Sequence, residues 1–133
     1  MINVLVVEDS LSQRQMISAF LTKIGLNVTE ASNGSEAFYK ICTQCPGLPD
    51  LIVLDIVMPL MNGYEVCRFL KSHPKTRKVP VVLCSAKAEP LDRYWGMKQG
   101  ADAYISKPFY PQELLGTLKQ VLQRRQAASV LRP

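Results

Sequence analysis

The chain of 133 residues is 47% hydrophobic and 20% charged, which is typical of one globular domain. It has no apolar run of the roughly 18 residues that a membrane span needs, and no basic flank followed by a long apolar stretch at its start, so we expect a cytoplasmic protein. The formal net charge is +5, but apart from Lys75, Arg77, Lys78 and the pair Arg124-Arg125 the basic residues are scattered, so no nucleic-acid surface is expected.

The first part of the chain alternates strand and helix patterns. The apolar run 3–7 predicts a strand, and Ser10-x-x-Gln13 has the form of a capping box that opens a helix ending at Gly25. The buried face of that helix is expected to carry Met16 or Ile17, Phe20, Leu21 and Ile24. A shorter strand covers 26–31, and Asn33-x-x-Glu36 predicts a second helix that runs to about Cys45.

The central strand is predicted over 50–55. Residues 51–54 form an uninterrupted apolar run, which is typical of a strand covered on both faces, and Met58-Pro59 then turns the chain. Asp55 therefore ends this strand. A third helix starts at Asn62-Gly63 and ends at Pro74. Its inward residues are expected to be Val66, Phe69 and Leu70.

The alternation continues to the end of the chain. We expect a strand over 79–84, a helix over 89–99, a strand over 103–106 and a last helix that begins at Pro111. The buried face of the last helix is expected to carry Leu114, Leu115, Leu118, Val121 and Leu122. Five strands alternating with five helices predict a doubly wound parallel α/β sheet in a single domain over 1–125, followed by a frayed tail over 126–133.

Several common site motifs are missing or incomplete. There is no G-x-G-x-x-G, P-loop or nucleophile-elbow sequence, so neither common kind of nucleotide site is supported. Cys42 and Cys45 have C-x-x-C spacing, but the chain has no second pair and only one histidine, His73, to complete a zinc site. We interpret the pair as ordinary thiols, with a redox role as the alternative.

Polar side chains follow the predicted strands at the end where each strand stops. Glu8 and Asp9 follow the first strand, Asp55 ends the third, Ser85 follows the fourth and Lys107 follows the fifth. In an open parallel sheet these ends share one edge, where ligands bind. Three carboxylates in one crevice repel one another unless a cation joins them, and an all-oxygen cluster suits magnesium. The alternative interpretation is that Asp9 and Asp55 only cap helices.

This joint pattern resembles the response-regulator receiver domain, the CheY-like phosphoacceptor part of two-component signalling. The resemblance covers Ile2 to about Arg125. It rests on Glu8-Asp9, Asp55 with Met58-Pro59 and Gly63, Ser85-Ala86, and the run from Tyr104 to Phe109. It implies a flavodoxin-like five-stranded sheet with strand order 2-1-3-4-5.

The resemblance also implies a chemistry centred on one aspartate. Asp55 would be the nucleophile that accepts a phosphoryl group from a histidine kinase or a phosphotransfer domain. Asp9 and Asp55 would bind Mg²⁺, with Glu8 acting mainly through water and the backbone carbonyl of Val57 as a further ligand. Such a site catalyses phosphoryl transfer mostly by positioning and charge neutralisation.

Three more residues receive roles from the resemblance. Lys107 would balance the charge on the side opposite the metal, and the Ser85 hydroxyl would bind the phosphoryl group. Tyr104 would be the switch residue that moves into the space vacated by Ser85; the alternative is a ring that always points inward. Lys107-Pro108 is expected to have a cis peptide bond, as in the family.

The output expected from the sequence is binding. No recognisable domain follows Arg125, so we expect a stand-alone receiver that binds its target through the helix over 89–99, the strand over 103–106 and the last helix. We expect a monomer, with a phosphorylation-linked dimer as the alternative. The run that starts at Trp95 is similar to the corresponding run in regulators of type IV pilus twitching motility and phototaxis. The alternative is that Trp95 only packs within the helix over 89–99.

Two rival functions are compatible with parts of this pattern. A magnesium-dependent phosphatase with an aspartate nucleophile places a second aspartate two residues later, but Val57 stands there, so turnover of outside substrates is not expected. The chain would catalyse only its own phosphorylation and dephosphorylation. A phosphate sink or relay without its own downstream target is the alternative, and the apolar Val57 predicts slow loss of the phosphoryl group.

Overall fold

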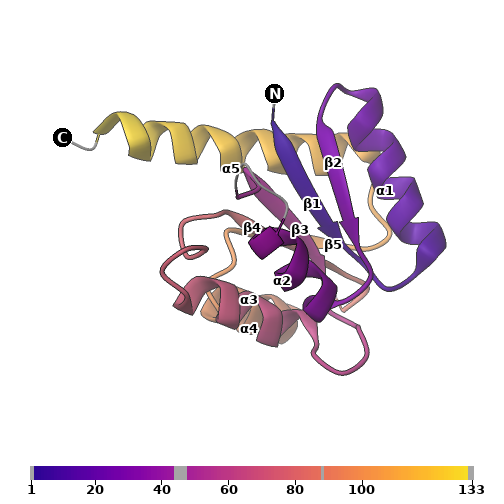
Figure 1. Cartoon of the computed structure of the whole chain (residues 1–133). Helices are drawn as coiled ribbons and strands as arrows, with labels where there is room; N and C mark the ends of the chain where they lie inside the picture. Colours follow the sequence, from indigo (N-terminus) through magenta and orange to yellow (C-terminus); the bar gives the residue numbers. More distant parts are fainter. Residues whose placement is uncertain (1, 44–47, 88, 132–133) are drawn as a thin grey trace.

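Strands and helices alternate strictly along the chain in the computed structural model, which describes residues 2–43, 48–87 and 89–131 (Figure 1). The strands are β1 (Asn3–Val7), β2 (Asn27–Ala31), β3 (Leu51–Asp55), β4 (Val81–Ser85) and β5 (Ala103–Ser106). The helices are α1 (Leu11–Lys23), α2 (Gly34–Thr43), α3 (Gly63–Ser72), α4 (Pro90–Lys98) and α5 (Pro111–Leu131). No helix in these described ranges is both long and apolar enough to span a membrane.

The five strands form one parallel sheet in the order β2-β1-β3-β4-β5. This confirms the predicted fold class and the strand order that the resemblance implied. The register aligns the strand ends: Val7 lies opposite Leu54, and Ser85 lies opposite Ser106. Residues that follow each strand are therefore brought to one edge of the sheet, as expected for parallel strands.

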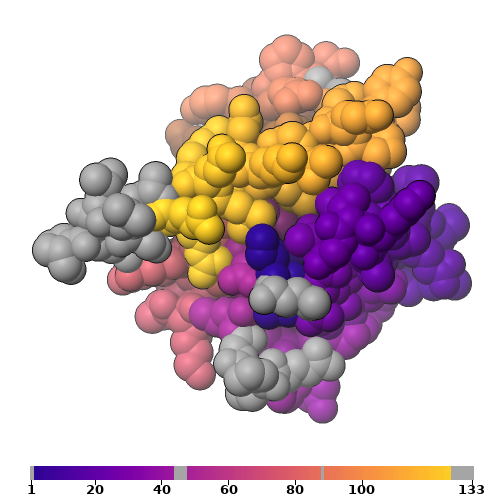
Figure 2. Space-filling view, turned by 90° about the horizontal axis from the view of Figure 1, so that it is seen from above, coloured from indigo at the N-terminus to yellow at the C-terminus, as the bar shows by residue number. Residues whose placement is uncertain are grey.

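Helices cover both faces of the sheet, which explains the apolar run in β3. Residues of α1 and α5 pack on one face with Val4, Val6, Leu51 and Val53, whereas α2 and α3 pack on the other with Ile52 and the strand residues that share its side. Figure 2 shows α5 beside α1 on the first of these faces. Burial of both faces explains why the residues of β3 do not alternate between apolar and polar.

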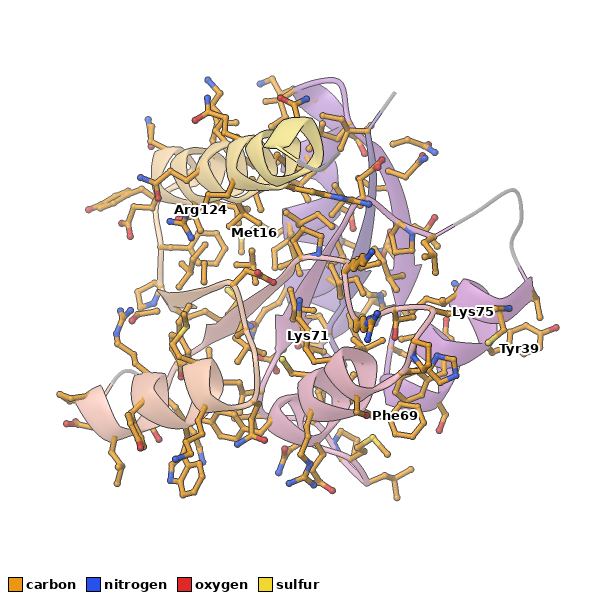
Figure 3. All side chains as sticks on the ribbon, turned by 90° about the vertical axis from the view of Figure 1, so that its left-hand side faces the viewer. Met16, Tyr39, Phe69, Lys71, Lys75 and Arg124 are labelled. Atoms are coloured by element: carbon orange, nitrogen blue, oxygen red, sulfur yellow. The ribbon has the colours of Figure 1, made fainter. Side chains whose placement is uncertain are left out.

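Two predicted helix faces are corrected by the structure. In α1, Ile17 is buried and Met16 is 61% exposed, which decides between the two candidates, while Ile24 lies outside the core at the helix C-cap. In α3, Phe69 does not point into the core: it is 50% exposed on the side of the helix toward α2 (Figure 3), where its ring packs against Phe38 at 4.7 Å between centroids. Ile24 and Phe69 lie at the margin of the apolar stripe of their helices, where the position of a neighbouring helix decides whether a side chain is buried.

Helix ends also differ in places from the expected ones. Helix α5 continues to Leu131, so the frayed tail expected from Gln126 is wrong over 126–131. The segment after Leu122 has lost its apolar spacing, but Gln, Arg and Ala are strong helix formers and no glycine interrupts them. Helix α2 ends at Thr43, and the predicted end at Cys45 lies outside the described residues.

Candidate active site

The polar residues predicted to meet at the carboxyl edge of the sheet do so. Glu8 directly follows β1, Asp55 is the last residue of β3, Ser85 is the last of β4 rather than the residue after it, and Lys107 follows β5. Glu8, Asp55 and Ser85 are buried, with 2%, 6% and 0% of their surface exposed, whereas Asp9 is exposed at the mouth. The site is thus a recessed group of charges with one open side.

Three carboxylates form the acidic part of the site. One oxygen each of Glu8, Asp9 and Asp55 lies within 4.8 Å of the others. Oxygen ligands from one or two carboxylates, completed by water, are what a magnesium ion prefers. The exposure of Asp9 leaves the cluster open to solvent, so a partly hydrated ion fits this donor set. The predicted carbonyl ligand, Val57, lies two residues past Asp55 with its side chain 56% exposed, and its role stays a prediction.

Lys107 places a positive charge within this acidic cluster. Its Nζ donates to Glu8 Oε1 and to Asp55 Oδ1, the latter at 3.2 Å. A third hydrogen bond, at 2.6 Å, goes to Oε1 of Gln13 in the first turn of α1. From the sequence, Gln13 was expected only to cap the helix. The signal that could have identified it is its place in the first turn of the helix that follows Glu8-Asp9.

Burial and charge shift the acid–base properties of this group. Burial raises the pKa of Asp55 to about 6, assisted by the charge of Glu8 and opposed by Lys107. Burial alone would lower the pKa of Lys107, but its hydrogen bond to Glu8 and the charge of Asp55 reverse the shift and raise it. Lys107 is therefore an ammonium, and Asp55 is mostly ionised at neutral pH, the form in which a carboxylate is a nucleophile.

Ser85 and Tyr104 are joined through the backbone of one residue. The Ser85 Oγ accepts a hydrogen bond of 3.1 Å from the N–H of Lys87, and the Tyr104 hydroxyl donates to the carbonyl of the same residue. The Tyr104 ring is half-buried, with the Arg93 guanidinium 5.2 Å from its centroid. Movement of the segment after β4 would therefore change the hydrogen bonds of both side chains. The link through Lys87 was not foreseen from the sequence.

The remaining predicted features lie around this core. Lys107-Pro108 has a cis peptide bond, as expected. On α4, Trp95 is 48% exposed and its ring lies edge-on to that of Tyr94, with 6.2 Å between centroids. Half of the Trp95 surface is thus available to a partner, so it is not a core residue of α4.

Comparison with protein-family models and curated proteins gives a consistent result. The model described as "Response regulator receiver domain" matches residues 4–119. The transcriptional regulatory protein GltR of Pseudomonas aeruginosa is 31% identical over 96% of the chain, and the probable transcriptional regulator ycf27 of Pyropia yezoensis is 41% identical over 91%. The alkaline phosphatase synthesis transcriptional regulatory protein PhoP of Bacillus subtilis is 37% identical over 95%. The chain spans about half the length of these relatives, 52%, 47% and 50% respectively.

Solved structures with the same fold are of similar size to this chain. A putative response regulator from Chloroflexus aurantiacus has a TM-score of 0.85 at 31% identity, covering 91% of this chain and 97% of its own. The chemotaxis protein CheY4 of Vibrio cholerae has a TM-score of 0.82 at 34% identity, covering 91% of this chain and 98% of its own. A CheY-like receiver domain protein from Methanospirillum hungatei has a TM-score of 0.85 at 26% identity, covering 96% and 98%.

Proposed function

Because the chain belongs to the response regulator receiver domain family, whose members take phosphoryl groups from histidine kinases, we propose that Asp55 is its phosphoacceptor. One observation carries the proposal: the Asp55 carboxylate that ends β3 shares an acidic, metal-compatible cluster with Glu8 and Asp9 and also accepts a hydrogen bond from the Lys107 ammonium. That arrangement suits transfer of a group whose negative charge spreads over several oxygens.

The proposed reaction moves one phosphoryl group and leaves its charge balanced. An oxygen of the Asp55 carboxylate attacks the phosphorus, a P–O bond forms, and the P–N bond to the kinase histidine breaks with its electron pair returning to the imidazole. Lys107 donates hydrogen bonds to the group throughout and loses no proton. When bound, Mg²⁺ would offset charge on the phosphoryl oxygens, and Asp9, Asp55 and, through water, Glu8 would hold it together with the Val57 carbonyl.

We propose that Ser85 reports the phosphorylation to Tyr104. A phosphoryl oxygen on Asp55 offers the Ser85 hydroxyl a charged acceptor, which is a stronger partner than a neutral one. If Ser85 turns toward it, the N–H of Lys87 loses its acceptor, and the carbonyl that now binds the Tyr104 hydroxyl moves with the same residue. The ring would then be free to change its position against α4.

The output surface in this proposal is α4-β5-α5. It includes the exposed Tyr94 and Trp95 of α4 and contains Tyr104 in β5, so a change at the site reaches it directly. We propose a role in motility or taxis, supported by the Trp95 run and by the likeness to a chemotaxis protein, although several relatives are named transcriptional regulators. We also propose that the protein is cytoplasmic, that it does not turn over outside substrates and that it acts as a monomer. Its action as a stand-alone receiver stays a prediction.

Phosphorylation in vitro tests the proposal. The chain is incubated with acetyl phosphate and magnesium, and its intact mass is compared with that of Asp55→Asn. We expect a gain of one phosphoryl group by the wild type only, accompanied by a change in Trp95 fluorescence. No gain, or a gain that persists in the variant, contradicts the assignment. A pull-down with the two states then separates an output receiver, which retains a state-dependent partner, from a phosphate sink, which retains none.

A further inference from the structure

Gln13 does not behave as the capping pattern of the sequence predicts. In a capping box the third residue of the helix returns its side chain to the backbone N–H of the N-cap. Here the N–H of Gln13 donates to Ser10 Oγ at 3.4 Å, but the N–H of Ser10 donates to Glu8 Oε2 at 3.1 Å instead. The Gln13 amide oxygen is thereby left for Lys107, 94 positions away, whose Nζ lies 2.6 Å from it.

The three hydrogen bonds account for every donor of the Lys107 ammonium. A lysine ammonium has three N–H groups and no acceptor. One donates to Glu8, one to Gln13 and one to Asp55, and the bond to Asp55, at 3.2 Å, is longer than that to Gln13. The hydrogen bonds to Glu8 and Gln13 therefore fix the direction of the third N–H, which points at Asp55.

Gln13 differs from Glu8 in charge and in position. Glu8 is a buried carboxylate that holds the ammonium from inside the site, whereas Gln13 is an exposed, neutral amide on the solvent side. Lysine is a flexible side chain whose ammonium is strongly hydrated, so an N–H without an acceptor on that side would turn toward water. The neutral amide supplies an acceptor there without adding to the negative charge that faces an incoming phosphoryl donor.

We infer that Gln13 is a positioning residue for phosphoryl transfer: it fixes Lys107 from the solvent side so that one N–H stays directed at the oxygen of Asp55 that faces it. This inference rests on the proposed function. With acetyl phosphate the Asp55 carboxylate attacks the phosphorus, a P–O bond forms, and the bond from phosphorus to the acetyl oxygen breaks with its electron pair leaving on acetate. Lys107 stabilises the charge on the transferring group without giving up a proton.

The substitution Gln13→Leu removes the acceptor while keeping a side chain of similar length. The matched control is Gln15→Leu, since Gln15 is an exposed residue of the same helix outside the site. We expect Gln13→Leu to lower the maximal rate of phosphorylation by acetyl phosphate about tenfold, as for the loss of one hydrogen bond to a charged group. The apparent KM should change little, because the ammonium acts mainly in the transition state.

A spectroscopic measurement tests the position of Lys107 without any reaction. Lysine ammonium signals are seen by ¹⁵N NMR at low temperature when hydrogen bonds slow proton exchange, and the signal of Lys107 is assigned by its absence in Lys107→Met. We expect the signal in the wild type and in Gln15→Leu, and its broadening in Gln13→Leu. A broadened signal together with a slower rate supports the inference.

The outcomes separate this inference from the proposed function. If the wild type is phosphorylated on Asp55 and Gln13→Leu matches it in rate and in the Lys107 signal, the positioning role is wrong while the phosphoacceptor assignment stands. The role is equally wrong if Gln15→Leu is slowed as much as Gln13→Leu. If the wild type gains no phosphoryl group, the proposed function fails, and the Lys107 signal alone then decides whether Gln13 holds the lysine.

Discussion

Substituting Gly63 by alanine should destabilise the protein at the point where α3 meets the end of β3. Gly63 is buried at the start of α3, and its N–H donates to the carbonyl of Ile56 at 2.8 Å. A Cβ on Gly63 would lie 2.2 Å from the carbonyl oxygen of Asp55 and 2.6 Å from the Cα of Ile56. Both neighbours are backbone atoms, so no side-chain rotation relieves the contact, and the helix or the strand end must move.

The size of the effect follows from that geometry. The closest contact is more than 1 Å inside the 3.4 Å at which ordinary contact begins. Overpacking of this kind costs about 1–3 kcal/mol, and weakening the Gly63–Ile56 hydrogen bond adds about 1 kcal/mol. Alanine recovers at most about 1 kcal/mol through its better helix propensity. The free energy of unfolding should therefore fall by about 2 kcal/mol, measured by urea unfolding followed by circular dichroism.

Gly116 provides the matched control. It lies within α5, and a Cβ there would meet nothing within 4 Å, so Gly116→Ala should raise the free energy of unfolding by about 0.5–1 kcal/mol. Gly63→Ala should also slow phosphorylation, because the displaced carbonyl belongs to Asp55 and small misplacements of reacting groups are costly. If Gly63→Ala unfolds within about 0.5 kcal/mol of the wild type, or if both variants shift in the same direction, the steric argument is refuted.

Further predictions concern the site and its support. Burial raises the pKa of Asp55 to about 6, so the folded state binds its proton more tightly than the unfolded state; this contribution to stability is present below about pH 4 and is lost as pH rises through 6. In EDTA, the stability of Asp55→Asn relative to the wild type should therefore increase from pH 4 to pH 8, and parallel urea-unfolding profiles would contradict this. Val57→Asn should shorten the lifetime of the phosphoryl group several-fold, because an amide at this exposed position can orient attacking water where valine cannot; an unchanged decay of the phosphorylated mass rules that explanation out. Asp102→Ala should lower the free energy of unfolding by about 1–3 kcal/mol, because Asp102 Oδ2 accepts 2.8 Å hydrogen bonds from Lys71 Nζ and from the N–H of Val81; a urea midpoint equal to that of the wild type would show that water replaces both.

Local patterns in the sequence predicted most of the fold. Continuous apolar runs marked the strands, and glycine, proline and capping residues marked most helix ends, because these signals act between residues close in sequence. Asn62 is an example: the helix predicted to start at Asn62-Gly63 does start there, and the Asn62 side chain accepts from the N–H of Glu65 while the Glu65 side chain accepts from the N–H of Asn62. The predicted inward position of Phe69 was wrong, because burial at the edge of an apolar stripe depends on which helix lies beside it.

The sequence by itself determined that Glu8, Asp55, Ser85 and Lys107 share one edge, because parallel strands bring their carboxyl ends together. Tertiary structure alone decided which atoms meet there. Lys107 Nζ donates to Gln13, which the sequence presented as a helix cap, because the sheet brings the end of β5 close to the start of α1, the helix that follows β1. Such contacts join residues far apart in the chain, and no local periodicity encodes them; they depend on the packing of the whole sheet and its helices.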